Sequence, residues 1–218
     1  QMSSLVLIPT VIINFLGIKF IASRMGQKKA LLFGTYGAIG TSVLMFCLMV
    51  WGDPSSFSFT NISFFTIAFC LLWIFQKGFS GISGNIVIPM TADCADYETY
   101  RTGKYVPGLM GTLFSFVDKV ISSLASTIVA LMFALVGYAQ EVPTDKSPWS
   151  EGLFWVVVIA FTIVPIIGWL CNVVAMKFYP LTKEKMEEIQ EKIAEIKAKN
   201  LAENEAAAAA EAVEAELP

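Results

Sequence analysis

The sequence contains no histidine, and this absence excludes several kinds of site. Neither a proton relay nor a metal centre can be built on imidazole groups here. The four cysteines offer no substitute, because Cys47, Cys70 and Cys171 fall in long apolar segments and Cys94 falls in a polar connection. Their spacing fits neither a disulfide framework nor a metal-ligand motif. The sequence therefore predicts no bound metal.

Catalytic patterns are missing as well. The glycines lack the spacing of a phosphate-binding loop. No nucleophile, general base and orienting group occur together along the chain. We therefore predict that the protein is not an enzyme and holds no cofactor.

Charged residues are scarce, and apolar residues take their place. Only 15% of the 218 residues are charged, whereas 56% are hydrophobic and seventeen are phenylalanine. The mean hydropathy is +0.65. A soluble domain carries about 25% charged residues. This composition predicts an integral membrane protein, and the net charge of −3 says little because the charges are unevenly placed.

Five apolar segments are long enough to cross a bilayer. Each is expected to be a helix, because a lone strand cannot satisfy its backbone hydrogen bonds in lipid. The fold class predicted is therefore an all-α membrane protein. The predicted spans are residues 3–22, 30–51, 62–88, 108–138 and 152–176.

Basic residues in the connections gather on one side of the predicted membrane. Lys146 is the only one on the other side. The positive-inside rule places this basic side, with the C-terminus, in the cytoplasm. The chain opens within an apolar segment without a signal peptide, which indicates the C-terminal part of a longer protein. The basic side holds Arg24, Lys28, Lys29, Arg101, Lys104, Lys177, Lys183 and Lys185.

The fourth span carries a narrow polar stripe along an apolar helix. Its members lie within about 100° of one another at helical spacing. Lys119 lies about 16 Å from Gly108 along the axis, near the middle of a hydrocarbon layer about 30 Å thick. An ammonium group there is expected to face a water-filled cavity or a counter-ion. The stripe consists of Thr112, Ser115, Lys119, Ser122, Ser123 and Ser126.

The third span has a similar stripe of Trp73, Lys77, Ser80 and Gly84. Lys77 is about 18 Å from Pro89, again near mid-depth. Two lysines at similar depth on successive helices suggest one shared cavity. The Trp73 indole either stacks on a bound sugar ring or packs between helices.

Asp118 lies beside the stripe of the fourth span. Lys77 and Lys119 are its candidate partners. The pair would either be a structural ion pair that makes the charges tolerable or one that breaks and reforms when a substrate or ion binds.

The connection between the third and fourth spans is dense in charge. Asp93, Asp96, Glu98, Arg101 and Lys104 occur within a dozen residues and can form short-range ion pairs. Such pairs at a helix end could act as a cytoplasmic gate. The alternative is a solvated loop that only sets topology.

This connection, PMTADCADYETYRTGKYVPG, resembles the loop between helices ten and eleven of the glycoside-pentoside-hexuronide:cation symporters, the melibiose permease family of the major facilitator superfamily. The following FSFVDK is similar to the family's helix-eleven segment, and it places the family's lysine at Lys119 and a sugar-cavity threonine at Ser115. RMGQKK resembles the basic loop between helices eight and nine, and the match includes Arg24. The connection itself matches at Asp93, Asp96, Tyr97, Glu98, Arg101, Thr102, Gly103 and Lys104.

The sequence departs from the family pattern in several places, and Ser23 also replaces the usual acidic residue of the loop between helices eight and nine. Residues 105–108, Tyr-Val-Pro-Gly, stand where many members carry a further charge pair of the gate. Gly84 stands where the melibiose permease has a cavity tryptophan, and Trp73 is a candidate replacement.

The resemblance implies helices eight to twelve of a twelve-helix transporter in the cell (inner) membrane. It implies symport of a glycoside, pentoside or hexuronide with Na⁺ or H⁺, the ion site being expected in the N-terminal half. The implied partners are that half, membrane lipid and the sugar, with no nucleic acid. Two lysines would suit an anionic sugar, although a neutral sugar with both lysines in ion pairs fits equally. The alternatives are a non-transporting sensor or assembly subunit and an uncoupled facilitator.

The chain divides into three parts. Residues 1–179 form the membrane domain, in which Pro165 predicts a kink in the last span. Residues 180–201 carry an apolar stripe that includes Met186, Ile189 and Ile193, which predicts an amphipathic helix that lies on the cytoplasmic face or contacts a partner. Residues 202–218 are an Ala/Glu-rich low-complexity tail.

Overall fold

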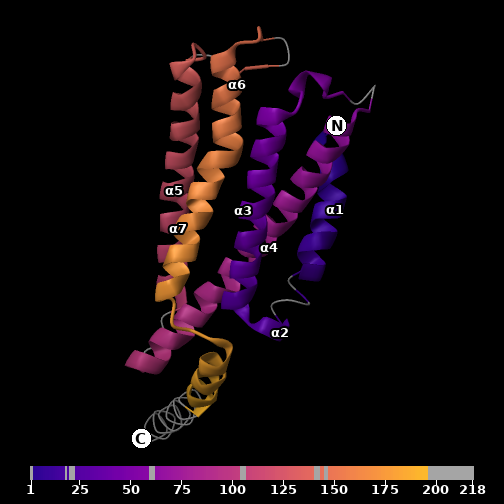
Figure 1. Cartoon of the computed structure of the whole chain (residues 1–218). Coiled ribbons are helices and arrows are strands. Elements are labelled where there is room, and N and C mark those ends of the chain that lie inside the picture. Colours follow the sequence, from indigo (N-terminus) through magenta and orange to yellow (C-terminus); the bar gives the residue numbers. More distant parts are fainter. Residues whose placement is uncertain are drawn as a thin grey trace, which may run out of the picture.

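The computed structural model describes residues 2–17, 19, 23–58, 62–103, 107–139, 143–144 and 147–195. These ranges are built from helices and connections, without strands, and the predicted all-α membrane class is confirmed (Figure 1). The final helix, residues 183–195, is called the tail helix below. The other elements are α1 (Met2–Gly17), α2 (Ser23–Met25), α3 (Gln27–Trp51), η2 (Pro54–Ser56), α4 (Phe64–Thr102), α5 (Pro107–Leu135), α6 (Glu151–Val158), the π-helical turn η3 (Ile159–Ile163) and α7 (Val164–Phe178).

Four described helices are long and apolar enough to cross a membrane. They are α3, α4, α5 and the continuous helix Glu151–Phe178. The first predicted span, residues 3–22, is helical over Met2–Gly17, and residues 18 and 20–22 lie outside the described part of the chain. The protein is therefore a multi-pass membrane protein.

The charged connection after the third span is not a loop over most of its length. It continues α4 as far as Thr102, where Gly103 closes the helix in the left-handed conformation with a φ of 71°. At 1.5 Å per residue, the 39 residues of α4 extend about 58 Å, well beyond a hydrocarbon layer of about 30 Å. Its last turns therefore project past the apolar span, on the side where the tail helix lies.

The helices pack around a close contact between α3 and α4. Helix α1 packs on α4, and α7 packs on α3 (Figure 1). The α3–α4 contact buries Ala30, Leu31, Ile82 and Ile86. A Cβ at Gly34 would lie only 2.8 Å from the carbonyl oxygen of Phe79, so the two backbones touch at this glycine.

Gly34→Ala is expected to lower the free energy of unfolding by about 1–3 kcal/mol, because the methyl group forces α3 away from α4. The matched control is Gly40→Ala, since a Cβ at Gly40 meets nothing within 4 Å. That control is expected to be neutral or to gain up to about 1 kcal/mol of helix propensity. Thermal unfolding in detergent measures both variants. Equal effects at the two positions would contradict the close contact.

The last span passes its proline without breaking. The π-helical turn Ile159–Ile163 lies just before Pro165, and the N–H of Val164 bonds to the carbonyl of Ile159. The wider turn thus accommodates a residue that has no N–H to donate. The local consequence of Pro165 is therefore a π-helical turn within a continuous helix.

Candidate functional site

The polar stripe of α5 lies on the side of that helix that faces away from the described bundle. Thr112, Ser115, Lys119 and Ser122 are exposed, as is Asp118. The opposite side of α5, which includes Leu113 and Val117, lines a cavity of about 380 Å³ with residues of α3, α4 and α7. The polar stripe and the cavity-lining side of α5 are about half a turn apart around the helix. The stripe therefore faces away from the other described helices.

The charges near mid-depth have no partner of opposite charge in the described part of the chain. The two ion pairs found there are Arg101–Glu98 and Lys192–Glu188. Asp118 is therefore paired with neither Lys77 nor Lys119. A lysine within an apolar span that has no described partner of opposite charge needs water or a counter-ion outside the described residues.

Lys77 faces a different helix from the one that carries Lys119. Together with Gln76 and Ser80, it lines a hollow of about 210 Å³ between α4 and the η3–α7 helix. Lys119 is not among the residues that line this hollow. The shared cavity expected for the two lysines is thus not formed by the described residues alone.

Trp73 packs between helices. Its ring lies 6.1 Å from that of Phe69 and meets Phe161 edge-on at 6.0 Å. Its indole nitrogen is buried and has no hydrogen-bond partner among the described residues. These contacts match the packing interpretation, and Trp73 does not line the hollow beside Lys77. At Gly84 a Cβ would meet none of the described residues within 4 Å.

A buried polar network that sequence reasoning missed joins three helices. The Thr35 hydroxyl of α3 lies 2.9 Å from the Ser83 hydroxyl of α4 and accepts a 3.0 Å hydrogen bond from the Asn172 amide of α7. The Gln76 amide donates to the Ser42 hydroxyl at 2.7 Å. Small and hydroxyl residues at helical spacing in an apolar span were the available signal for this contact.

Thr35→Val is expected to lower the free energy of unfolding by about 1–2 kcal/mol, because it leaves the Ser83 and Asn172 side chains without this partner. The matched control is Thr41→Val on the same helix, since within the described ranges the Thr41 hydroxyl donates only to carbonyls of its own helix. The control is expected to stay within about 0.5 kcal/mol of the wild type. Thermal unfolding in detergent measures both, and a neutral Thr35→Val would contradict a stabilising network.

The charged residues at the end of α4 form a tail-side cluster with the tail helix. Arg101 pairs with Glu98 of its own helix at 3.2 Å. The Asp96 carboxylate accepts a 2.6 Å hydrogen bond from Gln190 of the tail helix. The cluster comprises Asp93, Asp96, Tyr97, Glu98 and Arg101, whereas Arg24 is exposed on α2 and Lys104 lies outside the described residues.

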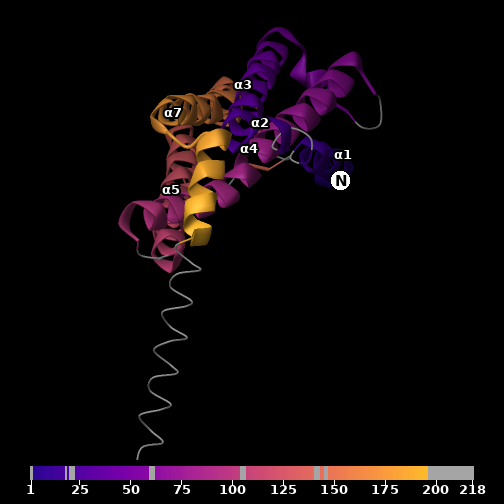
Figure 2. The ribbon, with the colours of Figure 1, turned by 90° about the horizontal axis from the view of Figure 1, so that it is seen from below.

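The apolar side of the tail helix is buried against this cluster. Ile189 and Ile193 are each 1% exposed. They pack with Leu181 against Tyr97 and Tyr100 of α4. Figure 2 shows the tail helix lying across the end of α4. Over the described residues 180–195 this segment thus contacts α4, whereas residues 196–218, which include the Ala/Glu-rich tail, lie outside the described part of the chain.

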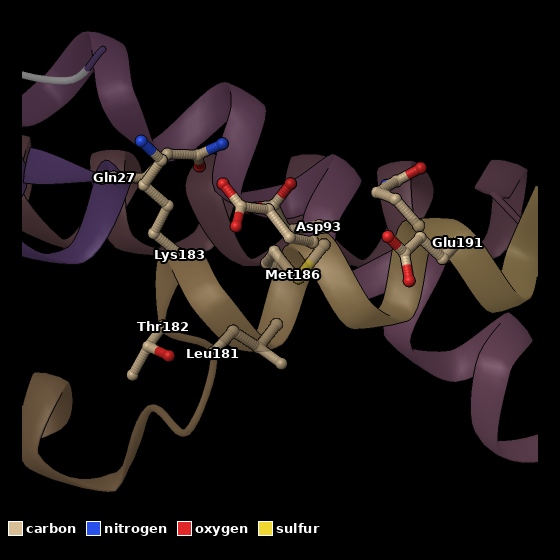
Figure 3. A pocket seen from close by; sticks show the side chains of 10 residues that line it. Gln27, Asp93, Leu181, Thr182, Lys183, Met186 and Glu191 are labelled. Carbon is tan, nitrogen blue, oxygen red and sulfur yellow. The ribbon is translucent and has the colours of Figure 1, made fainter. Parts of the chain in front are cut away.

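A cavity of about 490 Å³ lies beside this contact, between the tail helix, the start of α3 and Asp93 of α4. Asp93 and Gln27 face one another on its wall, with Lys183 and Glu191 on the tail side (Figure 3). Nearby, Tyr179 accepts a 2.5 Å hydrogen bond from Lys28 at its carbonyl oxygen. Burial raises the pKa of the Tyr179 phenol above its ordinary value, so the hydroxyl stays protonated.

Comparison with known proteins agrees with the resemblance. A family model described as MFS/sugar transport protein matches residues 1–183. A glucuronide carrier protein homolog of Escherichia coli (strain K12) is 29% identical over 168 residues, which cover 77% of this chain and 33% of the relative. An isoprimeverose transporter of Lactiplantibacillus pentosus is 24% identical over 184 residues, 84% of this chain and 34% of the relative.

A further relative has another kind of substrate in its name. A putative 2,3-dihydroxypropane-1-sulfonate exporter of Escherichia coli (strain K12) is 27% identical over 175 residues, 78% of this chain and 33% of the relative. The chain spans about a third of the length of these curated relatives. No solved structure matches the chain.

Proposed function

The chain belongs to the MFS/sugar transport protein family, and from that membership we propose that it forms part of a secondary active transporter. The proposed activity is symport of a glycoside, pentoside or hexuronide with a cation, by alternating access around a mid-membrane site. Family and relatives alike are transporters rather than enzymes.

The polar stripe of α5 is the observation that carries this proposal. It presents Thr112, Ser115, Lys119 and Ser122 at membrane depth with no described helix in front of them. A lysine and a row of hydroxyls are unfavourable against lipid. They are accounted for if the stripe faces the N-terminal half of the transporter across the substrate pathway. The coupling ion, Na⁺ or H⁺, would then bind on that other half.

The tail-side cluster fits a cytoplasmic gate in this scheme. Asp93, Asp96 and Tyr97 lie where α4 leaves the apolar span, and the tail helix covers them. The charged side chains that remain exposed there, such as Arg24 and Arg101, are available for contacts with the N-terminal half. In this proposal the C-terminus lies in the cytoplasm and the membrane is the inner membrane of the cell.

The test is uptake by vesicles that contain the full-length protein. Radiolabelled glycosides, pentosides and uronides are offered under an imposed sodium gradient, an imposed proton gradient or neither. Accumulation above equilibrium with one gradient, abolished by an ionophore for that ion, is the expected result. Entry that ignores both gradients would point to an uncoupled facilitator. A protein that admits none of these sugars would instead be a sensor or assembly subunit.

A further inference from the structure

We propose that the hollow between α4 and the π-helical turn binds the acidic end of an anionic sugar. Lys77 would bind the carboxylate, the backbone carbonyl of Ala160 would accept a sugar hydroxyl, and Trp169 would cover the ring. This inference rests on the proposed function and names the class of substrate that it serves. All three residues line the same hollow of about 210 Å³.

The π-helical turn leaves the backbone carbonyl of one lining residue, Ala160, without its usual helical donor. The α-helical donor for the Ala160 carbonyl is the N–H of Val164, but that N–H bonds to Ile159 instead. The donor one residue further along would be Pro165, which has no N–H. The Ala160 carbonyl is therefore left without either helical donor, and in a membrane such a group must find another one. π-Helical turns inside helices occur frequently at functional sites for this kind of reason.

Lys77 supplies a positive charge that the described residues do not neutralise. It lies about 20 Å along α4 from Phe64 and about 18 Å from Pro89, close to mid-depth. Its ammonium group makes neither a hydrogen bond nor an ion pair within the described ranges. Neighbouring Gln76 is held in place by its hydrogen bond to Ser42. The Gln76 side chain beside Lys77 is thus fixed by this hydrogen bond, and the ammonium group of Lys77 is available to bind an anion.

The lining of the hollow favours an anionic partner over a neutral one. Lys77 is its one ionisable residue and Ser80 adds a hydroxyl, with no carboxylate among the lining residues. A hydrogen bond from an ammonium group to a carboxylate is about twice as strong as one between neutral groups. A sugar acid gains this bond, whereas a neutral sugar offers Lys77 only a hydroxyl.

The aromatic residues and the size of the hollow suit one end of a sugar. Complete ligand pockets measure about 300–1,000 Å³, so a hollow of about 210 Å³ takes part of a ligand. Phe161, fixed by its edge contact with Trp73, and Trp169 provide the apolar surface on which the C–H face of a sugar ring packs. The rest of the substrate would extend toward the pathway.

The experiment compares two substrates that differ only in the acidic group. Phenyl β-glucuronide and phenyl β-glucoside are offered to vesicles with the full-length protein, and KM is measured for each. Lys77→Gln is expected to raise KM for the glucuronide by at least about tenfold and for the glucoside by less than about threefold. Lys77→Arg is expected to recover most of the glucuronide affinity because it keeps the charge.

Trp169→Leu probes the shared sugar ring. It is expected to raise KM for both substrates by about fivefold, because the ring packs on either sugar. The matched controls are Lys177→Gln, at the exposed end of α7, and Trp155→Leu, whose ring is 40% exposed on α6. Both controls are expected to leave the two KM values unchanged.

The outcomes separate this inference from the proposed function. If the wild type accumulates only the glucoside, or if Lys77→Gln changes both KM values equally, the inference is overturned while the symporter stands. If no sugar of the whole panel accumulates under any gradient, the proposed function fails. Equilibrium binding of the two compounds to the purified protein then decides the inference alone, and glucuronide binding no tighter than glucoside binding would overturn it.

Discussion

Lys119→Ala is expected to reduce the initial rate of sugar uptake by at least about 100-fold, to the level of vesicles without protein. Lys119 lies near mid-depth on the α5 stripe and has no counter-ion among the described residues. If the stripe faces the substrate pathway, loss of the ammonium group removes either a substrate contact or the partner of an acidic group across the interface. The measurement is gradient-driven uptake of the best substrate of the panel.

Two further variants locate the effect. Lys119→Arg keeps the charge and is expected to retain part of the rate. Val120→Ala changes the next residue, which is 44% exposed and lies off the polar stripe, and it is expected to transport normally. If Lys119→Ala transports at the wild-type rate, the lysine is structural and the pathway lies elsewhere.

Ile193→Asp is expected to release the tail helix from the end of α4. The side chain is 1% exposed and packs in the apolar cluster with Leu181 and Ile189. Its replacement forfeits about 1.5–3 kcal/mol of burial and adds the cost of an unpaired carboxylate in an apolar site. Together these exceed about 3 kcal/mol, so amide hydrogen exchange over residues 183–195 should accelerate by more than about 100-fold.

The matched control is Ala194→Asp. The side chain of Ala194 is exposed, about 100° around the tail helix from Ile193, so the same charge there should leave hydrogen exchange unchanged. Hydrogen exchange by mass spectrometry, on the full-length protein in detergent, measures both variants. Similar protection in the two variants would show that the tail helix is not held by its apolar face.

The connection after the third span shows where local reasoning ran short. Its charges and its basic residues mark it as polar and exposed, yet nothing in residues 91–102 breaks a helix until Gly103. The helical continuation of α4 therefore agrees with local propensity, whereas the expectation of a connector followed polarity alone. Polarity reports exposure to water and does not separate a helix that projects from the membrane from a loop.

Contacts between helices were even harder to predict from the sequence. The polar face of α5 could be drawn from spacing alone, because residues three and four apart share a face on any helix. Spacing could not show that Lys77 faces α7 and lines a different cavity from Lys119. The angle of a residue on its own helix does not specify which neighbouring helix it meets. The same limit hid the Thr35, Ser83 and Asn172 network, whose members come from three helices.

The sequence by itself determined that this is a helical membrane protein and which side of α5 is polar. These properties follow from composition and from the 3.6-residue period, which act within one segment. Only the tertiary structure decided that Gly34 sets the distance between α3 and α4, that Trp73 packs on Phe161, and that the tail helix covers the end of α4. Each depends on how separate helices fit together, and the free energy of that fit comes from surfaces distant in the chain.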